Sequence, residues 1–317
     1  MAHKILAVDP RFKRPDRQAQ IKEFLPPGFE LAVPPDFSRA TLLREARDAV
    51  AIISAMQPID AGLMDAAPSL RVVGKAGTGV DSIDVAAASA RKIPVANSPG
   101  PLRSTPVAEH AMTLMLMLAR RPWLWKTAER KLHTQMEGSA IGIVGLGNIG
   151  RGVAKRAAAF GMRVLAHTRT PGKFRPEGFQ VAETATLEEL LPQVDFLVLT
   201  LPLTPESRGL ISRKELALMK PSAVLVNVSR GPHVVTQDLV DALREGRLAG
   251  AGLDVTDPEP LPEGHPLWGM PNVVLSPHIA AHTDQVQTAS YRLLFDSIRR
   301  AVNGERVESL ANPQIYA

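Results

Sequence analysis

The feature that most constrains the fold is Gly145-Leu146-Gly147-Asn148-Ile149-Gly150, three glycines in the spacing G-x-G-x-x-G. An apolar run precedes it, a helix-compatible segment follows it, and a second apolar strand at 162–167 completes the spacing of a βαβ unit. In such a unit Gly145 permits the tight turn, Gly147 lets a pyrophosphate approach the backbone, and Gly150 lets the helix pack on the sheet. Glycines alone would also be typical of an ordinary turn. The context instead predicts a dinucleotide site, whose phosphate-binding residues are Gly145, Gly147, Asn148, Ile149 and Gly150.

Size and composition favour a globular enzyme of two domains. The length of 317 residues exceeds that of a usual single domain, and 45% hydrophobic with 22% charged residues is ordinary for a globular protein. The absence of cysteine excludes disulfides, thiolate nucleophiles and cysteine-bound metals. The net charge of +5 forms no long basic block, so we expect no nucleic-acid partner. No histidine or carboxylate cluster has metal-ligand spacing, and we expect no metal.

Two segments bear on the location of the protein. Residues 1–9 resemble a strand and not a signal peptide, and the longest apolar stretch, 111–119, is too short to span a bilayer. We expect a cytoplasmic protein without a membrane partner.

Apolar runs alternate with helix-like segments along the whole chain. The expected strands of the first half are 4–8, 30–33, 50–55, 70–74 and 95–97, separated by helices at 16–24, 38–46, 60–67 and 83–91. The expected strands of the second half are 140–144, 163–167, 194–199, 223–228, 249–253 and 273–275. Continuous apolar runs are typical of parallel strands that are buried on both faces. The pattern predicts an α/β fold with two Rossmann-like or flavodoxin-like doubly wound parallel-sheet domains and a cleft between them.

The boundary between these domains is expected near Pro99-Gly100-Pro101, just before a long helix at 104–121. A last amphipathic helix at 283–302 could return to the first domain. We therefore expect a discontinuous substrate (catalytic) domain, 1–102 plus 286–317, and a dinucleotide-binding domain, 103–285.

The long apolar helix is also a candidate subunit contact. Trp123 and Trp125 come directly after it, and aromatic residues are enriched at interfaces. We expect a homodimer.

Polar groups follow three strands of the second half. Arg230 follows the strand 223–228, Asp254 and then Glu259 follow the next strand, and His278 follows the last one. Ligands of an open parallel sheet bind outside the carboxyl ends of its strands. Taken singly, Arg230 could cap a helix, Glu259 could be a turn residue and His278 could be structural. Together, a cation, a carboxylate and an imidazole beside a nicotinamide are the groups that carbonyl reduction requires.

The chain resembles the D-isomer-specific 2-hydroxyacid dehydrogenases over essentially its whole length. The resemblance rests on the glycine motif and on four further segments, namely Leu201-Pro202-Leu203-Thr204, Asn227-Val228-Ser229-Arg230-Gly231, residues 254–260 and residues 271–278. The order and spacing of these motifs are highly specific.

The resemblance implies roles for the polar groups at the strand ends. His278 resembles the proton donor to the carbonyl oxygen, and Glu259 resembles the residue that orients its imidazole and favours the protonated form. Arg230 resembles the group that binds the substrate carboxylate and polarises the carbonyl. Asp254 resembles the residue that fixes the nicotinamide carboxamide.

The resemblance also implies further binding residues. In the first domain, Gly77 and Thr78 resemble the turn that binds the substrate carboxylate, and Lys75 begins the same segment. Arg230 and His278 complete the expected substrate set. Cofactor contacts are implied for Leu201, Pro202 and Val228, and Thr105 is expected near the nicotinamide.

The residues after the second strand of the dinucleotide unit indicate which nicotinamide binds. An acid normally accepts the ribose hydroxyls of NAD at this position, whereas here Thr168-Arg169-Thr170 follows the strand. Arg169 can form a charge-assisted contact with a 2′-phosphate. We therefore expect NADP(H) to be preferred, while NAD(H) stays the alternative if Arg169 only covers the adenine.

The expected function is the transfer of a hydride between NAD(P)H and a small 2-oxo acid, of the glyoxylate or hydroxypyruvate reductase type. The alternative is an NAD(P)-binding sensor or corepressor-like protein on the same fold, which would not need Arg230, Glu259 and His278 together. His282 is expected at most at the pocket wall. The other histidines are expected to be structural, namely residues 3, 110, 133, 167, 233 and 265.

Overall fold

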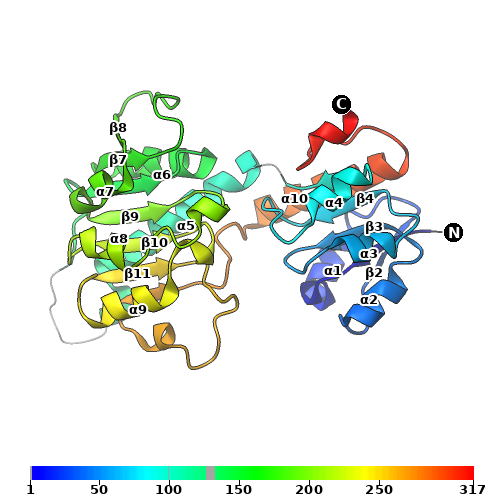
Figure 1. The fold of residues 1–317 in the computed structure, drawn as a ribbon, viewed down its shortest axis with the longest axis horizontal. Helices are drawn as coiled ribbons and strands as arrows, with labels where there is room; N and C mark the ends of the chain where they lie inside the picture. Colours follow the sequence, from blue (N-terminus) through cyan, green and yellow to red (C-terminus); the bar gives the residue numbers. More distant parts are fainter. Residues whose placement is uncertain (1, 99, 126–132) are drawn as a thin grey trace. The chain divides into compact units, whose positions relative to one another are not determined.

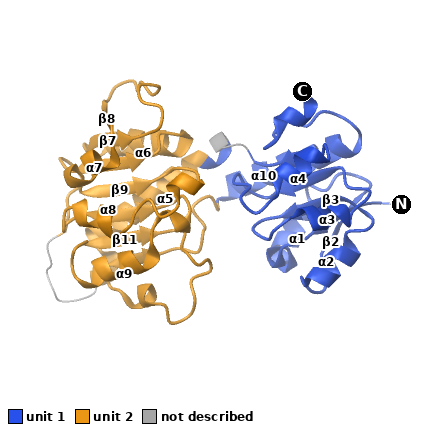
Figure 2. Ribbon diagram, in the orientation of Figure 1, with its two compact units in different colours: residues 1–103, 283–317 blue, residues 104–282 orange. Residues whose placement is uncertain are grey.

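The computed structural model describes residues 2–98, 100–125 and 133–317. The chain divides into two compact units, unit 1 (Met1–Arg103 with Thr283–Ala317) and unit 2 (Ser104–His282) (Figure 2). From the sequence alone, the boundaries are expected after residues 102 and 285. Of the punctuating tripeptide at this boundary, Pro99 lies outside the described residues.

Unit 1 is built on a five-stranded parallel sheet in the order β2-β1-β3-β4-β5 (Figure 1). Its strands are β1 (His3–Ala7), β2 (Phe29–Ala32), β3 (Ala49–Ser54), β4 (Val72–Lys75) and β5 (Val95–Ala96). Its helices are α1 (Pro15–Lys22), α2 (Arg39–Glu45), α3 (Ala61–Asp65), α4 (Val85–Ala90) and α10 (Asp284–Val302).

Alternate residues of each strand face opposite layers of helices in unit 1. Ile52 and Val73 pack with apolar residues of α2, α3 and α4. Ile53 and Val72 pack with α1 and with the inner side of α10, which includes Phe295. The C-terminal helix therefore completes a core that begins at the N-terminus.

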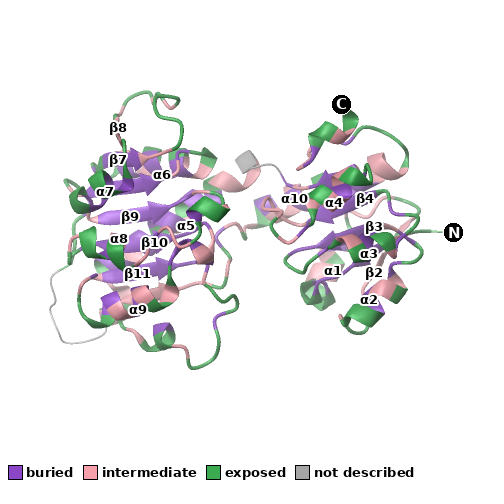
Figure 3. Cartoon of the chain, in the orientation of Figure 1, coloured by how far each residue is buried: buried purple, intermediate pink, exposed green. Residues whose placement is uncertain are grey.

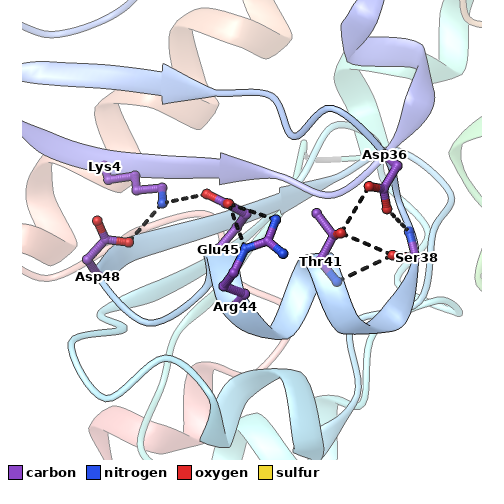
Figure 4. A network of polar contacts seen from close by, with 7 residues as sticks. All are labelled: Lys4, Asp36, Ser38, Thr41, Arg44, Glu45 and Asp48. Atoms are coloured by element: carbon purple, nitrogen blue, oxygen red, sulfur yellow. Dashed lines mark hydrogen bonds and ion pairs between the residues drawn. The ribbon is translucent and has the colours of Figure 1, made fainter.

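Polar contacts cap the N-terminus of α2 and link its C-terminal end to β1 (Figure 4). At its N-terminus the Thr41 amide donates to Ser38 Oγ, and Thr41 Oγ1 donates to Asp36. At its C-terminus Lys4 Nζ of β1 lies 3.2 Å from Glu45 Oε2 and 2.8 Å from Asp48 Oδ1. Burial alone would lower the pKa of Lys4, but hydrogen bonds to these two carboxylates raise it.

Unit 2 is built on a seven-stranded parallel sheet in the order β12-β11-β10-β9-β6-β7-β8. Its strands are β6 (Ala140–Val144), β7 (Arg163–His167), β8 (Val181–Thr184), β9 (Phe196–Leu199), β10 (Val224–Asn227), β11 (Gly250–Leu253) and β12 (Val273–Leu275). Its helices are α5 (Gly100–Arg120), α6 (Asn148–Ala159), α7 (Leu187–Leu190), α8 (Arg213–Leu218) and α9 (Thr236–Arg244); α5 begins in unit 1.

The sheet of unit 2 is also covered on both faces. Helices α5 and α6 pack on one face around Ile141, Ile143 and Val226. Helices α7, α8 and α9 pack on the other around Leu197 and Leu225. The central strands are buried while the outer sides of the helices are exposed (Figure 3). Both sheets confirm the predicted α/β class.

Two elements differ from the sequence-based expectation. The edge strand β8 was not predicted, because Val181–Thr184 is short and only partly buried, and so lacks an apolar run. Helix α5 begins at Gly100 and not at residue 104, since a proline in the first helical turn costs no hydrogen bond. None of the described helices has the length and apolar character needed to cross a membrane.

Candidate functional site

The carboxyl ends of the central strands of unit 2 lie in one row. The register pairs Val144 with Leu199, Leu199 with Asn227, Asn227 with Leu253, and Leu253 with Leu275. Residues that follow these positions therefore meet at one edge of the sheet. In chain order they are the glycine motif, Leu201 with Pro202, Val228 with Arg230, Asp254 with Glu259, and His278.

In the turn between β6 and α6, packing requires a glycine at position 150, whereas Gly147 leaves space for a ligand. Gly145 has φ +98°, which favours glycine, and Thr200 Oγ1 donates to its carbonyl at 2.7 Å. A Cβ on Gly150 would lie 2.0 Å from that carbonyl oxygen, whereas a Cβ on Gly147 would meet no heavy atom within 4 Å. Since Gly147 caps the N-terminus of α6, an anionic group fits against the open backbone at this point.

Buried polar contacts fix the turn that carries Arg230. Asn227 Nδ2 donates to the Arg230 carbonyl at 2.8 Å, and the Ser229 amide donates to Asn227 Oδ1 at 3.0 Å. A Cβ on Gly231 would lie 1.9 Å from the carbonyl oxygen of Thr256. The turn after β10 is therefore packed directly against the backbone that follows β11, with the half-buried Arg230 at its start.

Glu259 and His278 are in direct contact. Nδ1 of His278 lies 2.7 Å from Glu259 Oε1, and both side chains are about one quarter exposed, at 27% and 24%. The Glu259 loop is anchored by Thr236 Oγ1, which donates to the Asp257 carbonyl at 2.7 Å. With Nδ1 bound to the carboxylate, Nε2 is the nitrogen that can exchange a proton with a ligand.

Asp254 fixes the backbone around His278. Its buried carboxylate accepts hydrogen bonds from Ser276 Oγ at 2.7 Å, from the Ile279 amide at 2.9 Å and from the Ala280 amide at 3.0 Å. His278 itself has φ +56°, a left-handed conformation that is uncommon outside glycine. The carboxylate therefore stabilises the turn that orients the imidazole; the predicted contact with a nicotinamide carboxamide stays a prediction.

Lys75 of unit 1 connects two loops at the carboxyl edge of its sheet. This buried side chain donates through Nζ to the Ala55 carbonyl and to Ser82 Oγ. The loop after β3 and the loop after β4 are thus tied together by one ammonium group.

The turn at Gly77 and Thr78 is fixed by the segment after β5. The Ser98 amide donates to the Gly77 carbonyl at 2.9 Å, and Asn97 Nδ2 donates to the Thr78 carbonyl at 2.8 Å. The hydroxyl of Thr78 is buried, with no hydrogen-bond partner in the described part of the chain. The turn therefore keeps one hydroxyl that is not used by the fold.

The remaining predicted cofactor residues follow β7 or lie on α5. Arg169 and Thr170 are exposed after β7, next to the half-buried Thr168, and Thr105 is exposed on α5. A hydrogen bond with Thr204 holds the pKa of Glu206 below its ordinary value, and the Arg169 guanidinium contributes to this effect.

Two histidines that are expected from the sequence to be structural, His110 and His233, lie near the site. His110 of α5 lies 2.8 Å from Ser276 Oγ and 3.5 Å from Asp254 Oδ1. His233 is fully buried beside the Arg230 turn. The contact between His110 and Ser276 joins residues 166 positions apart, so no local pattern indicates it. Across the described ranges, no cluster of three or more His, Cys, Asp or Glu side chains could hold a metal.

Comparisons with known proteins agree with this arrangement. Residues 109–280 match the family model described as D-isomer specific 2-hydroxyacid dehydrogenase, NAD binding domain. The chain is 39% identical to a glyoxylate reductase of Thermococcus gammatolerans, over 90% of this chain and 91% of that protein. It is 36% identical to a D-3-phosphoglycerate dehydrogenase of Methanocaldococcus jannaschii, over 89% of this chain and 55% of that protein.

A solved structure is similar over the whole chain. The NADPH-dependent glyoxylate/hydroxypyruvate reductase from Sinorhizobium meliloti, in complex with NADP and malonate, has a TM-score of 0.84 and 32% sequence identity. The alignment covers 99% of this chain and 98% of that one. The chain belongs to the D-isomer specific 2-hydroxyacid dehydrogenases, a family of NAD(P)-dependent oxidoreductases.

Proposed function

We propose that the protein reduces small 2-oxo acids of the glyoxylate and hydroxypyruvate type with NADPH. The observation that carries this proposal is the contact between Glu259 and His278, 2.7 Å apart beside the strand end that bears Arg230. An oriented imidazole and a guanidinium are the two groups that stabilise negative charge on a carbonyl oxygen. The named activities of the relatives in Thermococcus and Sinorhizobium support the same substrate class.

The glycine turn and its neighbours would hold the cofactor. The open backbone at Gly147 and the helix start at Asn148 and Ile149 suit a pyrophosphate, because the amide dipoles of α6 favour an anion there. The adjacent residues Leu201, Pro202, Val228 and Asp254, with Thr105 on α5, would flank the rest of it. When bound, the reduced nicotinamide supplies a hydride for the carbonyl carbon.

The residues of the chain would supply the proton and the charge. As the carbonyl carbon gains the hydride, His278 Nε2 gives its proton to the oxygen, and a hydroxyl forms. Glu259 accepts a hydrogen bond from Nδ1–H and stabilises the charged imidazole before this transfer. Arg230 binds the carboxylate of the substrate and polarises the carbonyl.

Residues of unit 1 would contribute to substrate binding. We assign the amides of Gly77 and Thr78 as donors to the substrate carboxylate, with Lys75 supporting the same loop. The unpartnered hydroxyl of Thr78 supports this assignment, because a substrate oxygen would give it an acceptor.

The cofactor preference depends on Arg169. Thr168 occupies the position of the usual acid, which would repel a 2′-phosphate, and the exposed guanidinium of Arg169 follows it, so we expect NADPH to be favoured over NADH. The variant Arg169→Ala should lower kcat/KM with NADPH by about ten-fold to a hundred-fold, as expected for one charge-assisted contact, and leave the value with NADH within about two-fold. Arg175→Ala, an exposed arginine in the following loop, is the control. An unchanged ratio of the two cofactors would contradict the phosphate contact.

A substrate panel tests the activity itself. Oxidation of NADPH should be followed with glyoxylate, hydroxypyruvate, pyruvate and a bulky aryl pyruvate, and we expect turnover of the two smallest acids. Tight cofactor binding without turnover of any acid would instead support a cofactor-sensing protein.

We also propose a homodimer. Trp123 and Trp125, 38% and 65% exposed, follow the apolar helix α5 and would be covered by a partner. Light scattering should give twice the chain mass of 34.2 kDa.

A further inference from the structure

His233 links two loops at the carboxyl edge of the sheet in unit 2. The imidazole is fully buried in a short 3-10 turn, Gly231–His233, directly after Arg230. Its Nδ1 lies 2.9 Å from Ser229 Oγ, and its Nε2 lies 3.3 Å from the Pro202 carbonyl oxygen. One ring thus contacts the turn after β10 and the loop after β9.

The chain of contacts continues on both sides of the ring. On one side, Ser229 Oγ lies 2.7 Å from Asn227 Oδ1, and Asn227 Nδ2 donates to the Arg230 carbonyl at 2.8 Å. On the other side, the Pro202 carbonyl also accepts from Ser207 Oγ at 3.0 Å. Buried side chains therefore connect the main chain of Arg230 to the Pro202 carbonyl, beside the main-chain hydrogen bond from the Gly209 amide to the Pro232 carbonyl.

Packing alone does not require a histidine at this position. An apolar side chain could fill the same space, because Ser229 would keep its contact with Asn227 and Pro202 would keep that with Ser207. The side-chain contact with the Pro202 carbonyl would be lost, while the main-chain hydrogen bonds from the Gly209 amide to the Pro232 carbonyl and from the Ile211 amide to the His233 carbonyl would remain. In a buried environment such a side-chain contact is strong, because its polar atoms have no water as an alternative partner.

We propose that His233 is a positioning residue, which holds Arg230 in register with the Pro202 loop for binding of the substrate carboxylate. The expected effect on substrate binding rests on the proposed function. The physical coupling of the two loops stands independently of it. Arg230 touches the substrate, and His233 acts through Arg230.

Substitutions of His233 can test its contact with Ser229 and its contact with Pro202 separately. His233→Val removes both contacts, and His233→Asn keeps a polar group near Nδ1 for Ser229. His233→Gln keeps a donor near Nε2 for Pro202. Ser229→Ala breaks the chain on the Arg230 side with a smaller change, should His233→Val fail to fold. Ser212→Ala, which removes the N-cap of α8, controls for a general loss of stability.

Steady-state kinetics with glyoxylate and NADPH, NADPH affinity by fluorescence and hydrogen exchange by mass spectrometry form the test. We expect His233→Val to raise KM for glyoxylate about ten-fold with NADPH affinity within two-fold, and to speed amide exchange in both 200–208 and 226–236. His233→Asn and His233→Gln each keep one of the two contacts, so neither should recover the KM if the coupling of the loops needs both. Combined with Arg230→Lys, His233→Val should add less than a two-fold change.

Other outcomes would overturn the proposal. If His233→Val and Ser212→Ala lower the melting temperature alike while KM and exchange at 200–208 stay at wild-type values, His233 is only a packing residue. A ten-fold effect that persists with Arg230→Lys would show that it does not act through Arg230. If the wild type turns over no 2-oxo acid, the proposed function fails, and the exchange measurement still decides whether the ring couples the loops.

Discussion

At the scale of single residues, the conformation of His278 is the least expected feature of the site. A non-glycine residue at φ +56° is energetically unfavourable unless its surroundings hold it there. Here the His278 amide donates to the Asp254 carbonyl at 2.8 Å, and the two following amides donate to the Asp254 carboxylate. The direction of the imidazole is thus fixed by the backbone before Glu259 contacts it.

The charge of Glu259 should matter more than its shape. Glu259→Gln retains an oxygen that can accept from Nδ1–H, but it no longer stabilises the imidazolium that gives its proton to the carbonyl. We expect kcat to fall by about 10²-fold or more with little change in NADPH affinity. Glu263→Gln, an exposed carboxylate four positions further on, should behave as wild type. Equal rates for both variants would contradict the role of Glu259.

At the scale of an element, the β6–α6 turn offers a comparison of two glycines. Gly150→Ala should prevent stable folding of unit 2 or lower its melting temperature strongly, because the added carbon would lie 2.0 Å from the Gly145 carbonyl oxygen. Gly147→Ala should leave the melting temperature unchanged but weaken NADPH binding at least ten-fold, because its added carbon enters open space needed by the pyrophosphate.

Thermal unfolding and cofactor titration check both variants. Gly269→Ala is the control, since its Cβ would also meet no atom within 4 Å and lies in another loop. NADPH affinity that is equal in Gly147→Ala and Gly269→Ala would argue against a phosphate at Gly147.

The beginning of β6 is held by an ion pair whose strength depends on pH. Asp195 accepts from the Ala140 amide at 2.8 Å and from Lys220 Nζ at 2.8 Å. Burial alone would raise the pKa of Asp195, but these hydrogen bonds and the lysine charge hold it below the ordinary value. A depressed folded-state pKa contributes stability above the unfolded-state pKa of about 4, and this contribution is lost as the pH falls through the folded value.

Asp195→Asn should therefore lower the melting temperature by a few degrees at neutral pH, and the difference from wild type should shrink towards pH 4 and below. Calorimetry over this range tests it. Glu188→Gln, at an exposed pair with Lys214, should have no measurable effect. A difference that grows on acidification would show that the sign of this linkage is wrong.

At the scale of the whole molecule, the two units have separate cores among the described residues. Unit 1 depends on α10, where Phe295 is fully buried and Leu293 is exposed. All three tryptophans, at positions 123, 125 and 268, belong to unit 2. Tryptophan fluorescence therefore reports on unit 2, whereas circular dichroism reports on both units.

Phe295→Ala should destabilise unit 1 by about 3–5 kcal/mol, the cost of truncating a buried phenylalanine. We expect an earlier transition by circular dichroism and an unchanged one by tryptophan fluorescence. Leu293→Ala should change neither signal. If fluorescence and circular dichroism shift together in Phe295→Ala, the units unfold as one.

Part of this structure could be predicted from the sequence, because the patterns that indicate it involve residues close together in the chain. The apolar runs at 140–144 and 223–228 predict buried parallel strands, and parallel strands bring their carboxyl ends to one edge whatever the intervening loops are. That argument was enough to place Arg230, Asp254 and His278 on neighbouring strand ends. It failed for β8, whose residues are half exposed and carry no apolar run.

The sequence by itself determined the α/β class, the dinucleotide turn and the residue types that follow each strand, since each depends on neighbouring residues and on one topological rule. Only the tertiary structure decided that Asp254 braces the His278 turn, that His110 joins Ser276 across 166 positions, and that His233 connects two loops. These contacts depend on the relative placement of strands and helices far apart in the chain. A buried histidine and an exposed one look alike until that placement is known.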